Sequence, residues 1–202
     1  MLDSSISSGR RRRTRTFVTL SLAVIGAGAV MSSALFTDST NVGSNSFTNG
    51  TVVISTDPAT TALTASNMAP GDNVYGTVKV SNLGTLPMRY SITSNATNTD
   101  SKALASQLQM TVKSGVSTCD AAGFAGGSTL YNAAALGGLG TSLNILGDPS
   151  TGQQTGDRSL AAAANETLCF RVTLPTSTSN AYQGATTTAT LTFAAEQTTN
   201  NP

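Results

Sequence analysis

The sequence of 202 residues has no histidine, no tryptophan and only two cysteines, and just 10% of its residues are charged. Without histidine, neither a Ser-His-Asp nor a Cys-His triad can be built, and a His-ligated zinc protease site cannot be built either. No glycine-rich stretch has the lysine and the strand–helix frame of a phosphate-binding loop. A Ser-Lys pair stays open, but no spacing indicates one. The sequence therefore contains no recognisable catalytic constellation, and we expect no cofactor.

Positive charge is concentrated near the N-terminus. Five of the eleven basic residues lie between Arg10 and Arg15, whereas the chain from Leu35 onward has six basic and nine acidic residues. The body of the protein therefore lacks the basic patch that a nucleic-acid backbone requires. We do not expect it to bind nucleic acid.

The first 34 residues have the order of a secretory signal. A basic run, RRRRTR (10–15), precedes fifteen mostly apolar residues, FVTLSLAVIGAGAVM (17–31), and small residues follow up to Ala34. A bilayer-spanning helix needs about 20 apolar residues, and the glycines and serines here favour cleavage over retention as an anchor. We predict a cut between Ala34 and Leu35, a secreted protein, and contact with the membrane only during export.

Most of the remaining chain alternates apolar and polar residues with a period of two, which is typical of half-buried β-strands. Such stretches are TVVIS (51–55), VYGTVKVS (74–81), MRYSITS (88–94), LQMTVK (108–113), LCFRVTL (168–174) and ATLTFAA (189–195). One apolar and one polar face per strand indicates an all-β protein, an antiparallel two-sheet sandwich. One short helix is expected over residues 100–108.

Residues 115–164 are rich in Gly and Ala and are interpreted as long loops with short strands. Their expected core anchors are Leu130, Tyr131, Leu143, Ile145, Leu146 and Leu160. These patterns divide the chain into a cleavable signal (1–34), an extended N-terminal segment (35–50), a sandwich domain (51–197) and a polar tail (198–202).

Cys119 and Cys169 are the only cysteines. In an exported chain two cysteines form a disulfide by default, and a metal pair lacks the other ligands that it needs. Cys169 has the opposite parity to Leu168 and Phe170, so the bridge should clip a loop onto the outer face of a sheet.

Three aspartates, Asp120, Asp148 and Asp157, lie in Gly-rich segments and could contribute to a Ca²⁺ site. The EF-hand spacing is absent, however, and aspartates in loops commonly form turns. We therefore expect no metal.

Three stretches taken together resemble the TasA/camelysin family of bacterial exported proteins. They are ALFTDST…NSFTNGTVVIS (34–55), APGDNVYGTVKVSNLGTLPMRYSI (69–92) and ETLCFRVTLP…AYQGATTTATLTFAAEQ (166–197). The most specific parts are ALFTD and the F-x-x-G motif of Phe47 and Gly50. The resemblance implies a signal cut by a dedicated SipW-like signal peptidase and a jelly-roll-like sandwich. It also implies fibres in which the new N-terminal segment completes the sheet of a neighbouring copy.

We therefore expect a secreted structural protein, a subunit of extracellular fibres in a biofilm matrix or on a cell or spore surface. Its partners would be further copies of itself and other matrix or surface proteins. Phe36, Val42 and Phe47 are the expected plugs of the donated strand. The first alternative is a camelysin-like endopeptidase, although no residue can be assigned to that activity. The second is a monomeric binding module that uses the loops of residues 119–164.

Overall fold

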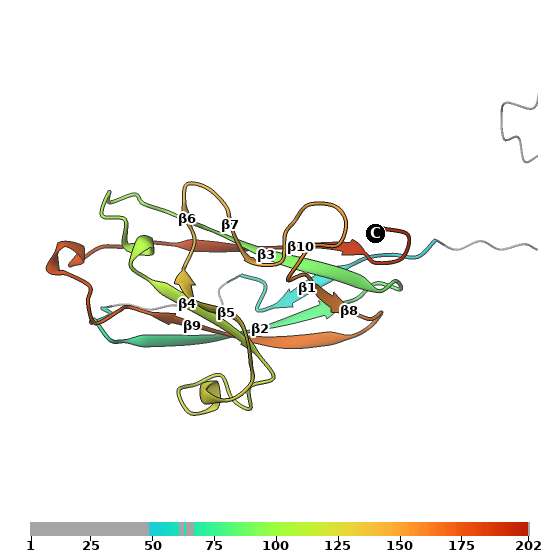
Figure 1. Ribbon diagram of the computed structural model, residues 1–202, viewed down its shortest axis with the longest axis horizontal. Coiled ribbons are helices and arrows are strands. Elements are labelled where there is room, and N and C mark those ends of the chain that lie inside the picture. The colour runs from blue at the N-terminus through green and yellow to red at the C-terminus, as the bar shows by residue number, and fades with distance from the viewer. Residues whose placement is uncertain (1–48, 61–62, 64–66, 202) are drawn as a thin grey trace, which may run out of the picture. The chain divides into compact units, whose positions relative to one another are not determined.

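Strands dominate residues 49–60, 63 and 67–201, which are the residues that the computed structural model describes (Figure 1). Helical structure in these residues is limited to three 3-10 turns, η1 (Leu104–Ser106), η2 (Gly123–Ala125) and η3 (Asn180–Tyr182). The predicted cleavage site, Ala34 and Leu35, and the predicted plugs, Phe36, Val42 and Phe47, lie outside the described residues.

The strands form two sheets that face each other (Figure 1). Sheet A has the order β1-β2-β9-β4-β5, and these strands are Ile54–Asp57, Asn73–Asn82, Asn165–Thr173, Gln109–Ser114 and Ser128–Ala135. Sheet B is built on β3 (Met88–Ala96). This strand pairs with β10 (Ala189–Gln197) along one edge and with β6 (Gly138–Leu139), β7 (Leu143–Leu146) and β8 (Arg158–Leu160) along the other. Within the described residues every strand pair except β3–β6 is antiparallel, so the predicted antiparallel two-sheet sandwich is confirmed.

The core between the sheets consists of the apolar residues that alternate along the strands. Within this core cluster, the residues exposed by 2% or less are Val78, Val80, Met88, Tyr90, Ile92, Met110, Val112, Leu168 and Phe170. The expected anchors of residues 115–164 also reach the core. Ile145, Leu146 and Leu160 are buried, and Leu130, Tyr131 and Leu143 pack against them while partly exposed. The period-two pattern therefore identified the buried face correctly.

The first strand lies further along the chain than residues 51–55. β1 begins at Ile54, which pairs with Asn82 of β2. The residues just before β1 instead form hydrogen bonds with the turn between β2 and β3. The carbonyl of Thr51 accepts the N–H groups of Thr85 and Leu86 at 3.0 and 3.1 Å. This contact, called the Thr51 clamp below, fixes the point at which the N-terminal segment joins the sandwich.

The helix predicted over residues 100–108 is wrong, because only η1 forms there. Asn98 Oδ1 accepts the N–H of Ala103 at 2.6 Å, and Asp100 Oδ1 accepts the N–H of Lys102 at 3.0 Å. These bonds hold a tight turn in which the φ angles are 58° at Ser101 and 55° at Ala103. An α-helix cannot contain such left-handed residues, so the segment forms turns.

The first half of β3 is covered on both faces, although the alternation predicted one solvated face. Arg89 and Ser91, on the outer side of sheet B, are only 4% and 3% exposed. The chain between β7 and β8 lies over this side and lines a hollow there. The C-terminal residues also return to it, because the N–H of Thr198 donates to the carbonyl of Pro87 at 3.1 Å. A polar side of sheet B has thereby become an interior surface.

Candidate functional site

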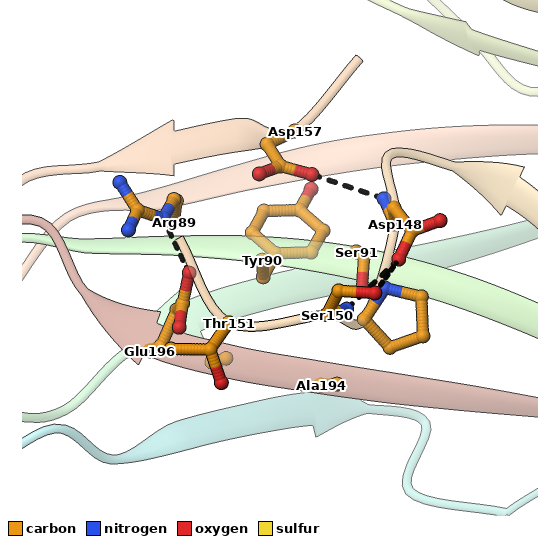
Figure 2. A pocket seen from close by; sticks show the side chains of 11 residues that line it. Arg89, Tyr90, Ser91, Asp148, Ser150, Thr151, Asp157, Ala194 and Glu196 are labelled. Atoms are coloured by element: carbon orange, nitrogen blue, oxygen red, sulfur yellow. Dashed lines mark hydrogen bonds and ion pairs between the residues drawn. The ribbon is translucent and has the colours of Figure 1, made fainter. Parts of the chain in front are cut away.

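A polar hollow of about 250 Å³ lies on the outer side of sheet B (Figure 2). Its walls come from β3, from the connection between β7 and β8, and from the end of β10. Three carboxylates line it, those of Asp148, Asp157 and Glu196. A cluster of acids in a hollow is the arrangement that an acid–base catalyst or a cation site would need, so their hydrogen bonds decide what it can do.

Glu196 is held in place by three donors. Arg89, its direct cross-strand partner, donates from Nε to Oε1 at 2.5 Å. The N–H of Gly152 donates to Oε1 at 3.0 Å, and Asn201 Nδ2 donates to Oε2 at 2.8 Å. The hydrogen bond from Arg89 is the main cause that holds the pKa of Glu196 below its ordinary value of 4.5. Arg89 also donates to the carbonyl of Asn201, so the pair ties the C-terminal residues to sheet B.

The two aspartates hold the loop itself in shape. Asp157 accepts the N–H of Asp148 at 3.0 Å through Oδ1 and the N–H of Gln154 at 2.9 Å through Oδ2. Asp148 Oδ1 accepts both the N–H and the hydroxyl of Ser150, at 2.9 and 2.5 Å. Its Oδ2 accepts Asn144 Nδ2 at 2.8 Å. The contacts with Ser150 are the main cause that lowers the pKa of Asp148.

Every carboxylate oxygen of this hollow therefore accepts at least one hydrogen bond from the protein. A general acid at neutral pH needs a raised carboxyl pKa, yet the pKa values of Asp148 and Glu196 are lowered. The hydrogen bonds of this hollow thus hold the β7–β8 connection and the C-terminal residues against sheet B. The sequence contained one signal of it, an arginine and a glutamate on two otherwise uncharged strands, but only their register shows that they pair.

A second polar cluster joins the two sheets. The hydroxyl of Tyr90 on β3 donates to Glu166 Oε1 on β9 at 2.6 Å. Arg158 of β8 contacts the other oxygen, Oε2, at 2.5 Å. Burial is the largest cause that raises the pKa of Tyr90, and the bond to Glu166 adds to it. The phenol therefore stays protonated and serves as a donor between the sheets.

The predicted disulfide is present and connects Cys119 with Cys169, at a Cα–Cα distance of 5.4 Å. Cys169 lies in the middle of β9, where its partners are Thr77 of β2 and Lys113 of β4. It has the opposite parity to the buried Phe170, so the bridge holds residues 115–127 against the outer face of sheet A, as the parity predicted.

Phe124 anchors the same loop. It is 4% exposed, and its ring meets that of Tyr75 edge to face at a centroid distance of 5.6 Å. Lys113 Nζ and Arg171 Cζ lie 5.0 and 4.7 Å from the centroid of the same ring. Lys113 Nζ also donates to the carbonyl of Phe124 at 2.8 Å. The disulfide and an aromatic–cation cluster thus hold one loop jointly.

The three aspartates considered for calcium do not meet. Asp148 and Asp157 share the hollow, but Asp120 belongs to the loop on sheet A, where its Oδ1 accepts the N–H of Gly123 at 2.8 Å. Within the described residues, no group of three or more acidic or cysteine side chains is placed to hold a metal ion.

The unpaired edge of β10 is the feature best suited to an interaction. β10 pairs with β3 over its whole length, from Ala189 with Ala96 to Gln197 with Met88. Among the described residues it has no strand partner on its other side. Its core-facing side chains, those of Leu191 and Phe193 above all, pack against the core but stay partly exposed. An open row of backbone groups beside incompletely covered apolar side chains can accept a further strand.

A protein-family model described as camelysin metallo-endopeptidase matches residues 15–114. The match runs from the apolar N-terminal segment to the end of β4. No curated protein matches the chain.

The metal in that description can be tested against the residues present. A zinc peptidase holds its metal with histidine, carboxylate or thiolate ligands. The chain has no histidine, and both cysteines form the disulfide. The carboxylates of the hollow each hold backbone or side-chain donors. The described residues therefore do not fit a catalytic zinc, and we derive no reaction step through one.

No helix within the described ranges is long and apolar enough to cross a bilayer. The matched span includes the F-x-x-G motif and two of the three stretches on which the resemblance rests, residues 34–55 and 69–92. The family match, the F-x-x-G motif and the two-sheet sandwich agree, and we conclude that the chain belongs to the TasA/camelysin family.

Proposed function

We propose that this protein is a secreted structural subunit of extracellular fibres, in a biofilm matrix or on a cell or spore surface, and that copies assemble by β-strand donation. The observation that carries the proposal is the free edge of β10, where Leu191 and Phe193 are only partly covered. A donated strand supplies main-chain hydrogen bonds along such an edge and covers the apolar side chains with its own.

The donor is the segment that a cut between Ala34 and Leu35 exposes. Fourteen residues, 35–48, precede the described chain after this cut, and an extended strand of that length spans about 46 Å. The nine residues of β10 span about 30 Å. The segment is therefore long enough to cover the whole edge and still leave a few residues as a connection between copies.

The side chains of the donor set its register. In a regular strand Phe36 and Val42 point to one face, and Phe47 points to the other. A bulge near Gly43 would bring all three to the core side, since glycine is well suited to a bulge. Phe36 and Val42 are thus the principal plugs, and Phe47 contributes where the strand is bulged.

The partners follow from this assembly. Each subunit binds a further copy of itself through one donor strand and one acceptor edge, and other matrix or surface proteins with a similar edge can join the fibre. A dedicated signal peptidase makes the cut that frees the donor. The charge balance of the body, six basic against nine acidic residues from Leu35 onward, supports a protein partner and not a nucleic acid.

Electron microscopy of the purified exported protein tests the proposal. We expect fibres from a chain that begins at Leu35 and none from a chain that begins at Thr51. The shorter chain should keep its fold, because the buried core lies entirely between Val78 and Leu174 and the Thr51 clamp is retained. Persistent monomers of the longer chain across salt and pH would contradict the proposal. A casein assay with and without chelator decides whether a peptidase activity is present instead.

A further inference from the structure

The exposed large apolar side chains of the described residues lie at the two ends of the sandwich. They are Val53 and Leu83, at 44% and 66% exposure, and Leu139, at 38%. β3 connects the two places, because it begins just after the turn that carries Leu83 and ends at Ala96, the partner of Leu139. Its nine residues separate the two ends by about 30 Å, along the long axis of Figure 1.

The turn that carries Leu83 is rigid. Asn82 is fully buried, its Nδ2 donates to the carbonyl of Leu86 at 2.9 Å, and its Oδ1 accepts the N–H of Gly84 at 2.9 Å. The N–H of Leu83 donates to the carbonyl of Val53 at 2.8 Å, so the two apolar side chains belong to neighbouring segments. A Cβ on Gly84 would lie 2.2 Å from the carbonyl oxygen of Thr51. Leu83 and Val53 are together called the apolar knob below. Both project from a backbone that these hydrogen bonds and close contacts hold in place.

The opposite end has a hollow that could take such a knob. It has a volume of about 470 Å³ and is lined by residues 95–99 together with Leu139 and Gly140. Leu139 supplies its exposed apolar wall. This volume exceeds that of a leucine side chain, so the hollow is large enough for the tip of Leu83.

We propose that the apolar knob of one copy docks into the hollow beside Leu139 on the next copy. Knob and hollow are different surfaces of one chain, so the contact is heterologous, and its repetition stacks copies end to end without closing a ring. The inference rests on the proposed polymerisation and names a second contact in it.

Strand donation and knob docking involve the same neighbour. The Thr51 clamp places the root of the donor beside the knob. The copy docked there presents its hollow end, and Ala189 at the start of β10 pairs with Ala96 at that end. The donor therefore enters the acceptor edge at Ala189 and runs antiparallel to β10. A second copy of the chain is the occupant that satisfies both contacts.

Cysteine cross-linking tests the contact. Leu83→Cys and Leu139→Cys, made separately in the exported chain that begins at Leu35, are mixed and oxidised mildly. We expect a covalent heterodimer from the mixture and a ladder of oligomers from the double variant. Asn132→Cys, exposed on β5, replaces Leu83→Cys in the control and should give little product with Leu139→Cys. Equal yields in the two mixtures, or a Leu83–Leu83 dimer alone, would overturn the inference.

A conventional variant gives a second measure. Leu83→Asn should raise the concentration needed for assembly about tenfold, because the tip loses its burial. Thr77→Asn is the matched control and should leave that concentration unchanged. If fibres form but no 83–139 product appears, strand donation stands and knob docking fails. If the chain that begins at Leu35 forms no fibres, the proposed function fails, and cross-linking of the concentrated protein still decides the end-to-end contact.

Discussion

The hydroxyl of Tyr90 donates a 2.6 Å hydrogen bond to Glu166 Oε1 and thereby joins sheet B to sheet A. Tyr90 is 1% exposed, and Arg158 holds the other carboxylate oxygen of Glu166 at 2.5 Å. A hydrogen bond from a buried hydroxyl to a charged acceptor is among the stronger polar contacts in a protein. The two sheets are thus fastened by a polar contact as well as by apolar packing.

Tyr90→Phe should lower the free energy of unfolding by about 2 kcal/mol, because Glu166 loses one donor while its contact with Arg158 remains. Urea denaturation at neutral pH measures the change. Tyr182→Phe, in η3 outside the core, removes a hydroxyl of the same kind and should change the stability little. A loss of equal size in both variants would show that the bond between the sheets adds nothing.

Removal of the disulfide should lower the free energy of unfolding. Cys119 and Cys169 are separated by 50 residues, and the chain-entropy model gives about 4 kcal/mol for closing a loop of that length. The double variant Cys119→Ala, Cys169→Ala should therefore lose about that much stability in guanidinium denaturation. Mass spectrometry under non-reducing conditions is the accompanying check, and two free thiols in the exported protein would contradict the bridge.

Acid should weaken the attachment of the C-terminal residues. The pKa of Glu196 is lowered in the folded protein, mainly by Arg89, so this stabilisation is present above the ordinary value of 4.5 and is lost as the pH falls through the folded value. Melting temperatures measured from pH 7 to pH 3 should fall less steeply in Glu196→Gln. Thr192→Val changes an exposed, uncharged position of the same strand as Glu196 and should keep the wild-type slope. Identical slopes in all three proteins would exclude Glu196 as a source of the pH dependence.

A charge at the core side of the acceptor edge should block assembly. Leu191→Lys places an ammonium where the donor strand must cover an apolar surface, so fibres should disappear from electron micrographs. Thr190→Lys adds the same charge to the outward face of β10 and should leave the fibres intact. Circular dichroism must show that both variants keep their strands. Fibres of Leu191→Lys with normal length would argue against β10 as the acceptor.

The strands could be predicted from the sequence because alternate burial is a local property, as at Val78 and Val80 of β2. The disulfide could be predicted because the chain has only two cysteines. The prediction of a helix over residues 100–108 was wrong because Ser101 and Ala103 have left-handed φ angles, in a turn that the side chains of Asn98 and Asp100 hold. The burial of Arg89 could not be predicted, since segments distant in the chain cover it. The free edge of β10 could not be predicted either, because the order of the strands is set by tertiary pairing.

Hydrogen exchange at the backbone amides of β10 tests strand donation most directly. The comparison is between assembled protein that begins at Leu35 and the monomer that begins at Thr51. Strand donation predicts that the amides on the free edge of β10, between Ala189 and Gln197, exchange far more slowly in the assembled protein. The amides of β9, at the centre of sheet A, should exchange equally slowly in both. Fibres whose β10 amides exchange as fast as those of the monomer would contradict it.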